Sequence, residues 1–424
     1  ALITSIYSVV DMAAVGQYQG PDGTAAFAVV APIWNIIYSL GLLMGIGGSV
    51  IFSMLRGKDG RTGANENEYF TVAVIGAVVL SIIVWISILF WEEPILLFFG
   101  ADENLLPLAQ TYLEPIQAVV PLFLFNQVLA AFLRNDGNPV LATAGVLAGG
   151  LFNIAGDYLF VFVFDLGIYG AGLATAIGSV LSFFVMLAHF RSKKNTLALQ
   201  KPTEVLCKLK EICITGFSTF FIDVAMGILT VLFNRQIMRY LGTNALAVYG
   251  PIVNVSTFVQ CCAYSVGQAS QPIISTNLGA KQWQRIQEVL RYALYTAAVF
   301  SIFWTTLSLA CPNLYITIFM KPTEEILEIA PAIIRSYSLS FVLLPINIFS
   351  TYYFQALMKP NAAFVVSVSR GCLVSGILIM MLPYAAGADA LWFAMPITEL
   401  IVAVYAVGRM IRYTKQLSFS ENEL

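Results

Sequence analysis

A carboxylate and an amide stand inside one of the most apolar stretches of the chain. Residues 151–164 read LFNIAGDYLFVFVF, with Asn153 and Asp157 four residues apart and therefore on one face of a helix. Asp11 lies in another apolar run, and Thr175 in a third is a candidate hydroxyl ligand. Oxygen groups of these types bind hard cations such as Na⁺, and two close carboxylates can share one proton because like charges disfavour double ionisation. The pattern predicts a proton or Na⁺ site; the simpler interpretation is a structural hydrogen bond.

Two further acids lie in apolar segments of the second half of the chain. Asp223 stands in FSTFFIDVAMG and Glu399 in FAMPITELIVA, and neither has a basic residue close to it in the sequence. Either could bind a cationic substrate or a proton. Asn126 and Tyr38, both in apolar segments of the first half, are additional candidates for substrate binding.

The composition places these polar residues in a membrane. Of the 424 residues 58% are hydrophobic and only 11% are charged, with a mean hydropathy of +0.80, whereas soluble domains average about 25% charged residues. Uninterrupted apolar runs of helical length, rather than short alternating segments, indicate an all-α membrane protein and not a barrel. A charge at the bilayer centre costs about 2.5–3.5 kcal/mol on insertion scales, so the buried acids are expected to have a function.

Apolar runs predict twelve membrane-spanning helices, over residues 1–16, 25–54, 69–91, 105–133, 139–164, 167–190, 212–240, 245–277, 288–318, 327–357, 361–384 and 389–412. Most lysines and arginines, Arg370 among them, are expected on one side of the membrane. This is the side on which the connections after the even-numbered spans lie. The four exceptions among the 22 basic residues are Arg235, Arg239, Lys321 and Arg335. The positive-inside rule then predicts that both termini lie in the cytoplasm.

The chain contains an internal repeat. Residues 26–36 read AFAVVAPIWNI and residues 245–255 read ALAVYGPIVNV, with six of eleven positions identical at an offset of 219. Weaker matches follow in the same order at nearly the same offset. An even number of helices per repeat predicts two parallel six-helix lobes, related by a pseudo-two-fold axis along the membrane normal. The predicted organisation is an N-lobe at 1–190, a cytoplasmic linker at 191–211 and a C-lobe at 212–424, with the first helix truncated at its start.

Other function classes find little support. A net charge of −2 without a basic stripe gives no indication of a nucleic-acid partner. The six cysteines lack metal-ligand spacing, and His189 stands at the end of an apolar run, where a structural role is expected. No nucleotide-binding or hydrolytic motif is present, so we expect a transporter that is not an enzyme, has no cofactor and uses an ion gradient.

Several segments together resemble the multidrug and toxic compound extrusion (MATE) family, in its prokaryotic DinF/MepA-like branch. They are SVVDMAAVG (8–16), AFLRNDGNP (131–139), LFNIAGDYLFVF (151–162), GAGLATAIG (170–178), QASQPIISTNLGAK (268–281) and WFAMPITELIVA (392–403). The resemblance implies two six-helix lobes, a central cleft and drug/cation antiport in the cytoplasmic membrane of a prokaryote. It also implies that Asp11, Asn153, Asp157 and Thr175 bind the coupling ion, Na⁺ or H⁺. Some members use an acid in span seven, where Asp223 lies nearby, or in span ten, where SYSLSFVLLPINIFSTYYFQ has none.

Three functions follow as alternatives. The first is a monomeric, cation-coupled exporter of amphipathic, often cationic drugs, with the lipid bilayer and small organic cations as its partners. The second is a flippase for lipid-linked sugars of the same superfamily, whose anionic pyrophosphate would favour arginines in the cleft. The candidates for such a place are Arg235, Arg239, Arg335 and Arg370, all of which can also be interfacial. The third is a passive channel or structural protein. Acids outnumber basic residues in the deep spans, which favours the first.

Overall fold

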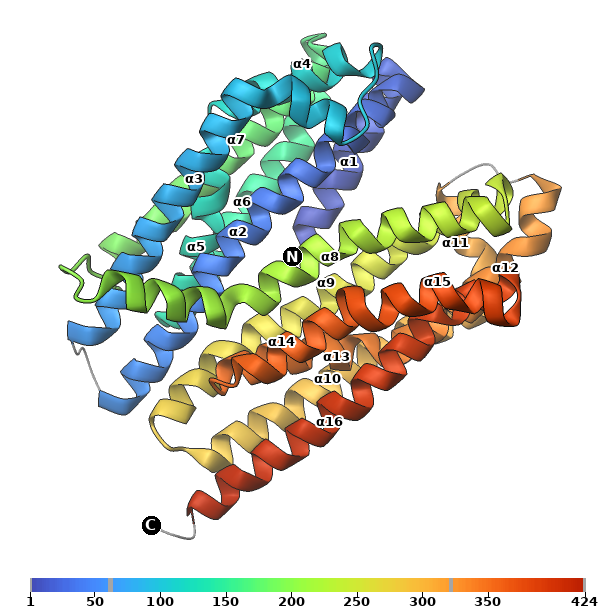
Figure 1. Cartoon of the computed structure of the whole chain (residues 1–424). Helices are drawn as coiled ribbons and strands as arrows, with labels where there is room; N and C mark the ends of the chain where they lie inside the picture. The colour runs from blue at the N-terminus through green and yellow to red at the C-terminus, as the bar shows by residue number, and fades with distance from the viewer. Residues whose placement is uncertain (1, 60–63, 320–322, 422–424) are drawn as a thin grey trace. The chain divides into compact units, whose positions relative to one another are not determined.

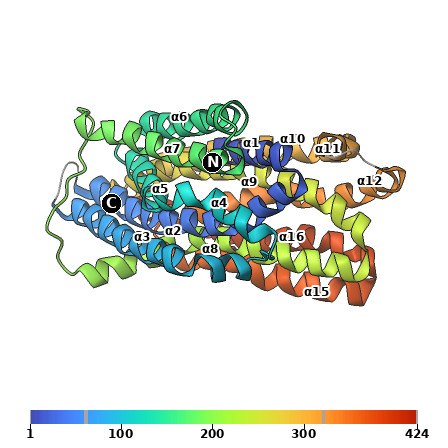
Figure 2. The same ribbon diagram turned by 90° about the horizontal axis from the view of Figure 1, so that it is seen from above.

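The computed structural model describes residues 2–59, 64–319 and 323–421; Ala1, Arg61 and Lys321, which enter the predictions above, lie outside these ranges. Within them the chain is almost entirely helical and contains no strand. Contacts between Cα atoms divide it into two units, Leu2–Phe220 and Phe221–Leu424. Figures 1 and 2 show the helices of both units.

The first unit is built from long helices that pack side by side. In Figure 1, α2 lies beside α3 and α5, and in Figure 2 α6 lies beside α7. The elements in order are α1 (Leu2–Gln19), α2 (Pro21–Asp59), α3 (Ala64–Phe98), α4 (Leu105–Gln117), α5 (Val120–Asn135), α6 (Pro139–Asp157), the π-helical segment η1 (Tyr158–Val163), α7 (Gly167–Leu187), the 3₁₀ segment η2 (Ala188–Arg191) and the first part of α8 (Val205–Tyr240).

The second unit follows a similar order of elements. Its α9, α10 and α13 pack against one another. After the second part of α8 come α9 (Thr243–Gly279), α10 (Trp283–Ala310), the short α11 (Pro312–Phe319), α12 (Glu324–Ser338), η3 (Leu339–Val342), α13 (Leu344–Ala356), α14 (Pro360–Val368), the π-helical η4 (Ser369–Leu373), α15 (Val374–Ala386), η5 (Ala388–Phe393) and α16 (Ala394–Glu421).

The lengths and compositions of these helices suit a membrane. Among the described residues, ten helices are long and apolar enough to cross one, and the bent pair α4–α5 makes an eleventh if it is one span. With α1, each half of the described chain contributes six successive helical segments. The predicted all-helical, multi-span architecture is confirmed.

The fourth helical segment is interrupted in both units. The sequence predicts one helix over residues 105–133, but α4 ends at Gln117, α5 begins at Val120, and the two axes differ by 58°. Pro121, at the start of α5, has no N–H to continue the hydrogen-bond ladder. In the second unit Pro345 takes the same place at the start of α13, after the short η3. Hydropathy alone does not detect such breaks, because both pieces are equally apolar.

The segment predicted as a free linker packs on the first unit. The N–H of Thr196 donates to Asp136 Oδ2 (2.9 Å), and the N–H of Ala198 donates to Asn67 Oδ1 (3.0 Å). Glu68 accepts from the Thr203 N–H at 2.7 Å and from Lys208 Nζ at 2.6 Å. The contact-based division ends the first unit at Phe220, inside α8.

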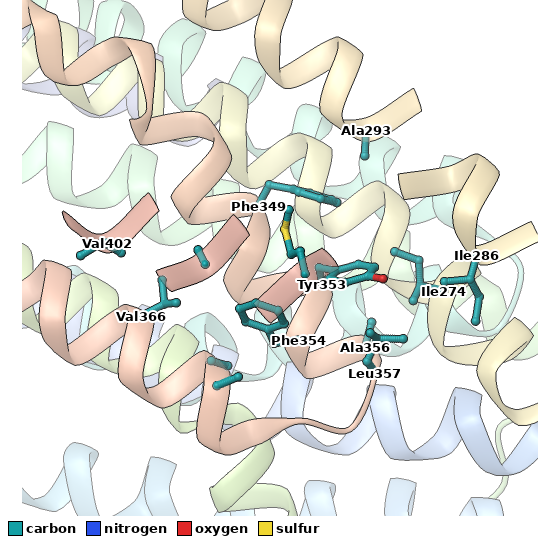
Figure 3. Packing of buried hydrophobic residues seen from close by; sticks show 14 residues of the cluster. Ile274, Ile286, Ala293, Phe349, Tyr353, Phe354, Ala356, Leu357, Val366 and Val402 are labelled. Carbon is teal, nitrogen blue, oxygen red and sulfur yellow. The ribbon is translucent and has the colours of Figure 1, made fainter. Parts of the chain in front are cut away.

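Aromatic and aliphatic side chains hold the second unit together at one end of α13. Figure 3 shows Phe349, Tyr353 and Phe354 of α13 between Ile274 of α9 and Val366 of α14, all of them buried. The Tyr353 hydroxyl lies 2.8 Å from Thr414 Oγ1 of α16, so its single polar atom has a partner. Burying this many rings fixes the positions of α9, α13, α14 and α16.

Candidate functional site

Three helices of the first unit bring Asp11, Asn153 and Thr175 together. The Asn153 amide donates to Asp11 Oδ1 and to Thr175 Oγ1, both at 3.0 Å. Thr175 Oγ1 lies 3.2 Å from Asp11 Oδ2 and 3.1 Å from the Ala171 carbonyl, and its single proton can serve only one of them. Asp11 and Asn153 are each 2% exposed, so water does not screen these contacts.

Asp157 joins this cluster as a second carboxylate. It is 1% exposed and close enough to Asp11 for the two charges to repel each other. Among the described residues, neither of its oxygens has a hydrogen-bond partner, nor has Asn153 Oδ1. No salt bridge to either aspartate is found in that part of the chain. Two buried, unneutralised carboxylates are strongly unfavourable, so a proton or a cation must bind with them.

Close packing of α6 on α7 makes the cluster possible. A Cβ atom on Gly149 would lie 2.5 Å from the Gly178 carbonyl oxygen, and one on Gly156 would lie 2.9 Å from Ala174 Cβ. Small residues at these positions let the two backbones approach, as is common in membranes. Asn153 lies between the two glycines and therefore reaches Thr175 directly.

The structure adds Tyr112 of α4 to the predicted residues. Its hydroxyl lies 3.5 Å from Asp11 Oδ2, and the residue is 1% exposed. Gly172 of α7 permits this, because a Cβ there would lie 2.2 Å from the Tyr112 carbonyl oxygen. Sequence reasoning missed Tyr112 because a tyrosine in an apolar helix has no distinctive spacing. The only signal available was the GAG sequence that faces it.

The donor set suits a hard monovalent cation. Carboxylate, amide and hydroxyl oxygens are the ligands that such ions prefer, and three unpartnered oxygens face this cluster. In the described part of the chain no group of three or more His, Cys, Asp or Glu side chains could hold a metal ion. A site of two carboxylates and neutral oxygens fits Na⁺ or a shared proton better than a transition metal.

The two acids of the second unit have different surroundings from each other. Asp223 Oδ1 accepts from the Tyr264 hydroxyl at 3.4 Å, and its Oδ2 has no partner among the described residues. Glu399 is fully buried, and its Oε1 accepts from Arg370 Nε at 2.7 Å. Arg370, predicted to belong with the cytoplasmic side, is 5% exposed and forms an ion pair inside the unit. Arg370 is therefore not part of an exposed connection, and it lies 29 positions before its partner Glu399, on a neighbouring helical segment.

Asn126 and Tyr38, the candidates for substrate binding in the first unit, lie on α5 and α2. The Asn126 amide donates to the carbonyl and to the hydroxyl of Ser179, both at 3.0 Å, which ties α5 to α7. Tyr38 is half-buried on α2. Neither residue forms a described hydrogen bond to Asp11, Asn153, Asp157 or Thr175. Their assignment to substrate binding stays a prediction.

Acids buried inside a multi-span helical bundle mark ion and substrate pathways, which is typical of membrane transport proteins. A family model named MatE matches residues 1–159 and 217–381. The chain therefore belongs to the MatE family, as the resemblance in the sequence predicted.

Individual relatives agree with this assignment over the whole chain. The multidrug export protein MepA of Staphylococcus saprophyticus is 24% identical over 428 residues, covering 100% of this chain and 93% of that protein. The solved MATE multidrug transporter DinF-BH is 27% identical with a TM-score of 0.87 and covers 97% and 92% of the two chains. A MATE transporter solved in an outward-facing conformation gives a TM-score of 0.88 at 19% identity, covering 98% and 93%.

Proposed function

We propose that the protein exports amphipathic, often cationic compounds in exchange for Na⁺ or H⁺. The observation that carries the proposal is the buried pair Asp11 and Asp157, which no basic side chain of the described residues neutralises. An exchanger needs a site whose charge state depends on an ion that can leave. The names of MepA and DinF-BH, a multidrug export protein and a multidrug transporter, support export as its purpose.

In this mechanism, binding of the ion and release of the drug are coupled through alternating access. With the ion bound, the acidic cluster carries one negative charge instead of two, and a conformation that buries it is favoured. Without the ion, two uncompensated carboxylates favour a conformation that exposes them to water or to a cationic substrate. Drug release toward the outside would accompany ion entry, and the ion would then move inward along its gradient. Asn153 and Thr175 hold Asp11 in position throughout.

The flippase alternative has less support from the geometry. A lipid-linked pyrophosphate carries several negative charges and would require several free cations in its path. Arg370 is the one buried arginine among the described residues, and a single cation is too few for a pyrophosphate. The deep charges that remain without an ionic partner in the described residues, Asp11, Asp157 and Asp223, are all negative.

The test is transport in liposomes. Protein reconstituted with a fluorescent organic cation inside or outside is exposed to an imposed Na⁺ gradient or, separately, to a pH gradient. We expect gradient-driven movement under one of them, lost in Asp157→Asn. Glu103→Gln removes an exposed acid of the same unit and should leave transport unchanged. If the wild type does not respond to either gradient while it remains folded, ion-coupled export is wrong; if Asp157→Asn transports normally, the coupling site is elsewhere.

We also propose that both termini face the cytoplasm of a prokaryotic cell. Arg56 of α2, His189 of η2 and Thr196 of the linker all bind Asp136 at the end of α5. This gathers the connections predicted to be cytoplasmic at one end of the first unit. Protease accessibility of a C-terminal tag in inside-out and right-side-out vesicles tests the orientation: cleavage should occur only in inside-out vesicles.

A further inference from the structure

The second unit contains a pocket whose only formal charge is positive. The empty space within it, counted together with space open to solvent, is about 350 Å³, and all the residues that line it come from this unit. Phe233, Tyr249 and Tyr337 provide aromatic walls, and Met226 and Met395 provide flexible apolar ones. Arg370 is the single ionised side chain among the described residues that line it.

The negative partner of Arg370 lies behind it rather than in the pocket. Glu399 is 0% exposed and does not line the pocket. Both of its carboxylate oxygens are occupied, one by Arg370 Nε at 2.7 Å and the other by Asn347 Nδ2 at 2.6 Å. Glu399 is therefore fixed on the protein side of the guanidinium, and a ligand in the pocket meets the cation first.

Arg370 has hydrogen-bonding capacity that the protein does not use. A guanidinium carries five N–H donors, and the Nε bond to Glu399 is the only hydrogen bond that Arg370 forms among the described residues. Its two terminal nitrogens form the planar fork that carboxylates bind bidentately. The residue is 5% exposed, so these donors are largely removed from bulk water. The terminal nitrogens are not among the buried atoms without a partner in the described residues, and Arg370 lines the pocket, so a ligand acceptor can reach them.

The local fold directs Arg370 to this place. It lies in the π-helical segment η4, a helix irregularity often found at functional sites. The next residue, Gly371, packs against α8: a Cβ there would lie 2.5 Å from Ala225 Cβ. The aromatic wall is also ordered, since the Phe233 and Tyr249 rings stack with centroids 5.1 Å apart. A rigid aromatic wall beside a fixed cation suits an aromatic compound with an acidic group.

We propose that this pocket binds the acidic end of an amphipathic substrate, with the terminal nitrogens of Arg370 holding a carboxylate against the aromatic wall. This inference rests on the proposed export function, since it names a substrate class for that function. It assigns the second unit to substrate recognition and leaves ion coupling with the first.

The test compares two dyes that differ in one group. One is a rhodamine ethyl ester, which is a simple cation, and the other is its free acid, a zwitterion with a carboxylate. Binding of each to purified protein is followed by fluorescence polarisation in detergent. Removing both charges with Arg370→Met/Glu399→Gln should weaken binding of the acid about tenfold, or about 1.4 kcal/mol, and change binding of the ester by less than about twofold.

The single variant Glu399→Gln sharpens the result. It removes the internal competitor of a ligand carboxylate, so the acid should bind several-fold more tightly than to wild type. A merely structural ion pair would not change binding of the acid while leaving binding of the ester nearly unchanged. The inference is overturned if wild type does not bind the acid, if both variants keep the wild-type ratio of the two affinities, or if both dyes weaken equally. Gradient-driven transport of the ester is a separate measurement, so failure of the export proposal is seen independently.

Discussion

Each unit contains an asparagine that bridges two helices, but the groups that accept its hydrogen bonds differ between the units. Asn126 of α5 donates to the carbonyl and hydroxyl of Ser179 on α7, and Asn347 of α13 donates to the carbonyl and carboxylate of Glu399 on α16. The asparagines stand 221 positions apart, close to the offset of 219 between the repeated segments. One duplicated contact thus joins the second piece of the interrupted helix to the last helix of each half.

The buried acids Asp11, Asp157 and Glu399 differ in whether a basic side chain neutralises them. In the first half, Asp11 and Asp157 lie close together, and no cation of the described residues pairs with them. In the second, Glu399 has Arg370 as a permanent counter-charge. A fixed pair does not need a mobile ion, whereas an unbalanced pair does. The comparison suggests that duplication supplied the scaffold and that later differences in charge divided ion coupling from other tasks.

The largest expected effect is the loss of gradient-driven transport in a variant of the first unit, which tests this comparison directly. Asp11→Asn should abolish gradient-driven transport, because it removes one of the two carboxylates whose ionisation the gradient controls. The double variant Arg370→Met/Glu399→Gln should retain a response to the same gradient for a simple cation, because it removes no net charge. Liposome transport of a cationic dye measures both. The division between the halves fails if the double variant uncouples transport and Asp11→Asn does not.

The next effect concerns stability of the second unit. Arg370→Met alone leaves Glu399 charged and buried, and breaking a buried pair in this way costs about 3–5 kcal/mol. Adding Glu399→Gln removes the orphaned charge and should restore most of that loss. Denaturant unfolding in mixed micelles measures the free energies. Equal destabilisation in the single and double variants would show that packing, and not the charge, is what Arg370 contributes.

The two asparagine bridges should differ in strength. Hydrogen bonds to charged groups contribute about 1.5–3 kcal/mol and neutral ones about 0.5–1.5 kcal/mol. Asn347→Ala should therefore destabilise the protein more than Asn126→Ala, since only the former loses a bond to a carboxylate. The same unfolding experiment gives both values. In the Glu399→Gln background the difference should shrink, and an unchanged difference would argue against charge as its source.

The sequence predicted the first unit's site better than the second's. Asn153 and Asp157 are four positions apart on one helix, and Asp11 and Thr175 were conspicuous as polar residues in apolar runs. Arg370 was predicted both among the basic residues of the cytoplasmic side and as a candidate for the cleft, because counting basic residues by side does not distinguish a loop from a buried ion pair. Its partner Glu399 belongs to another helix, and one sequence does not show which helices are neighbours.

Element boundaries show a similar limit. The apolar runs located the helices, but the break between α4 and α5 depends on Pro121 and on local backbone geometry. The packing of residues 196–208 on Asn67, Glu68 and Asp136 depends on pairs that stand 60, 131 and 135 positions apart. Hydropathy contains no information about such pairings.

The smallest predicted effects are those of two glycine-to-alanine substitutions, one in each half. They should change the free energy of unfolding in opposite directions. Gly156→Ala should destabilise by about 1 kcal/mol, because its Cβ would lie 2.9 Å from Ala174 Cβ and would press α6 away from α7. Gly376→Ala on α15 should stabilise by about 0.5–1 kcal/mol, because its Cβ would meet only Leu232 Cδ1 at 3.9 Å and alanine favours a helix. Unfolding of both variants under one condition provides the comparison. Two stabilising results would mean that close approach of α6 and α7 is not required, and the geometric basis for the contact of Asn153 with Thr175 would have to be revised.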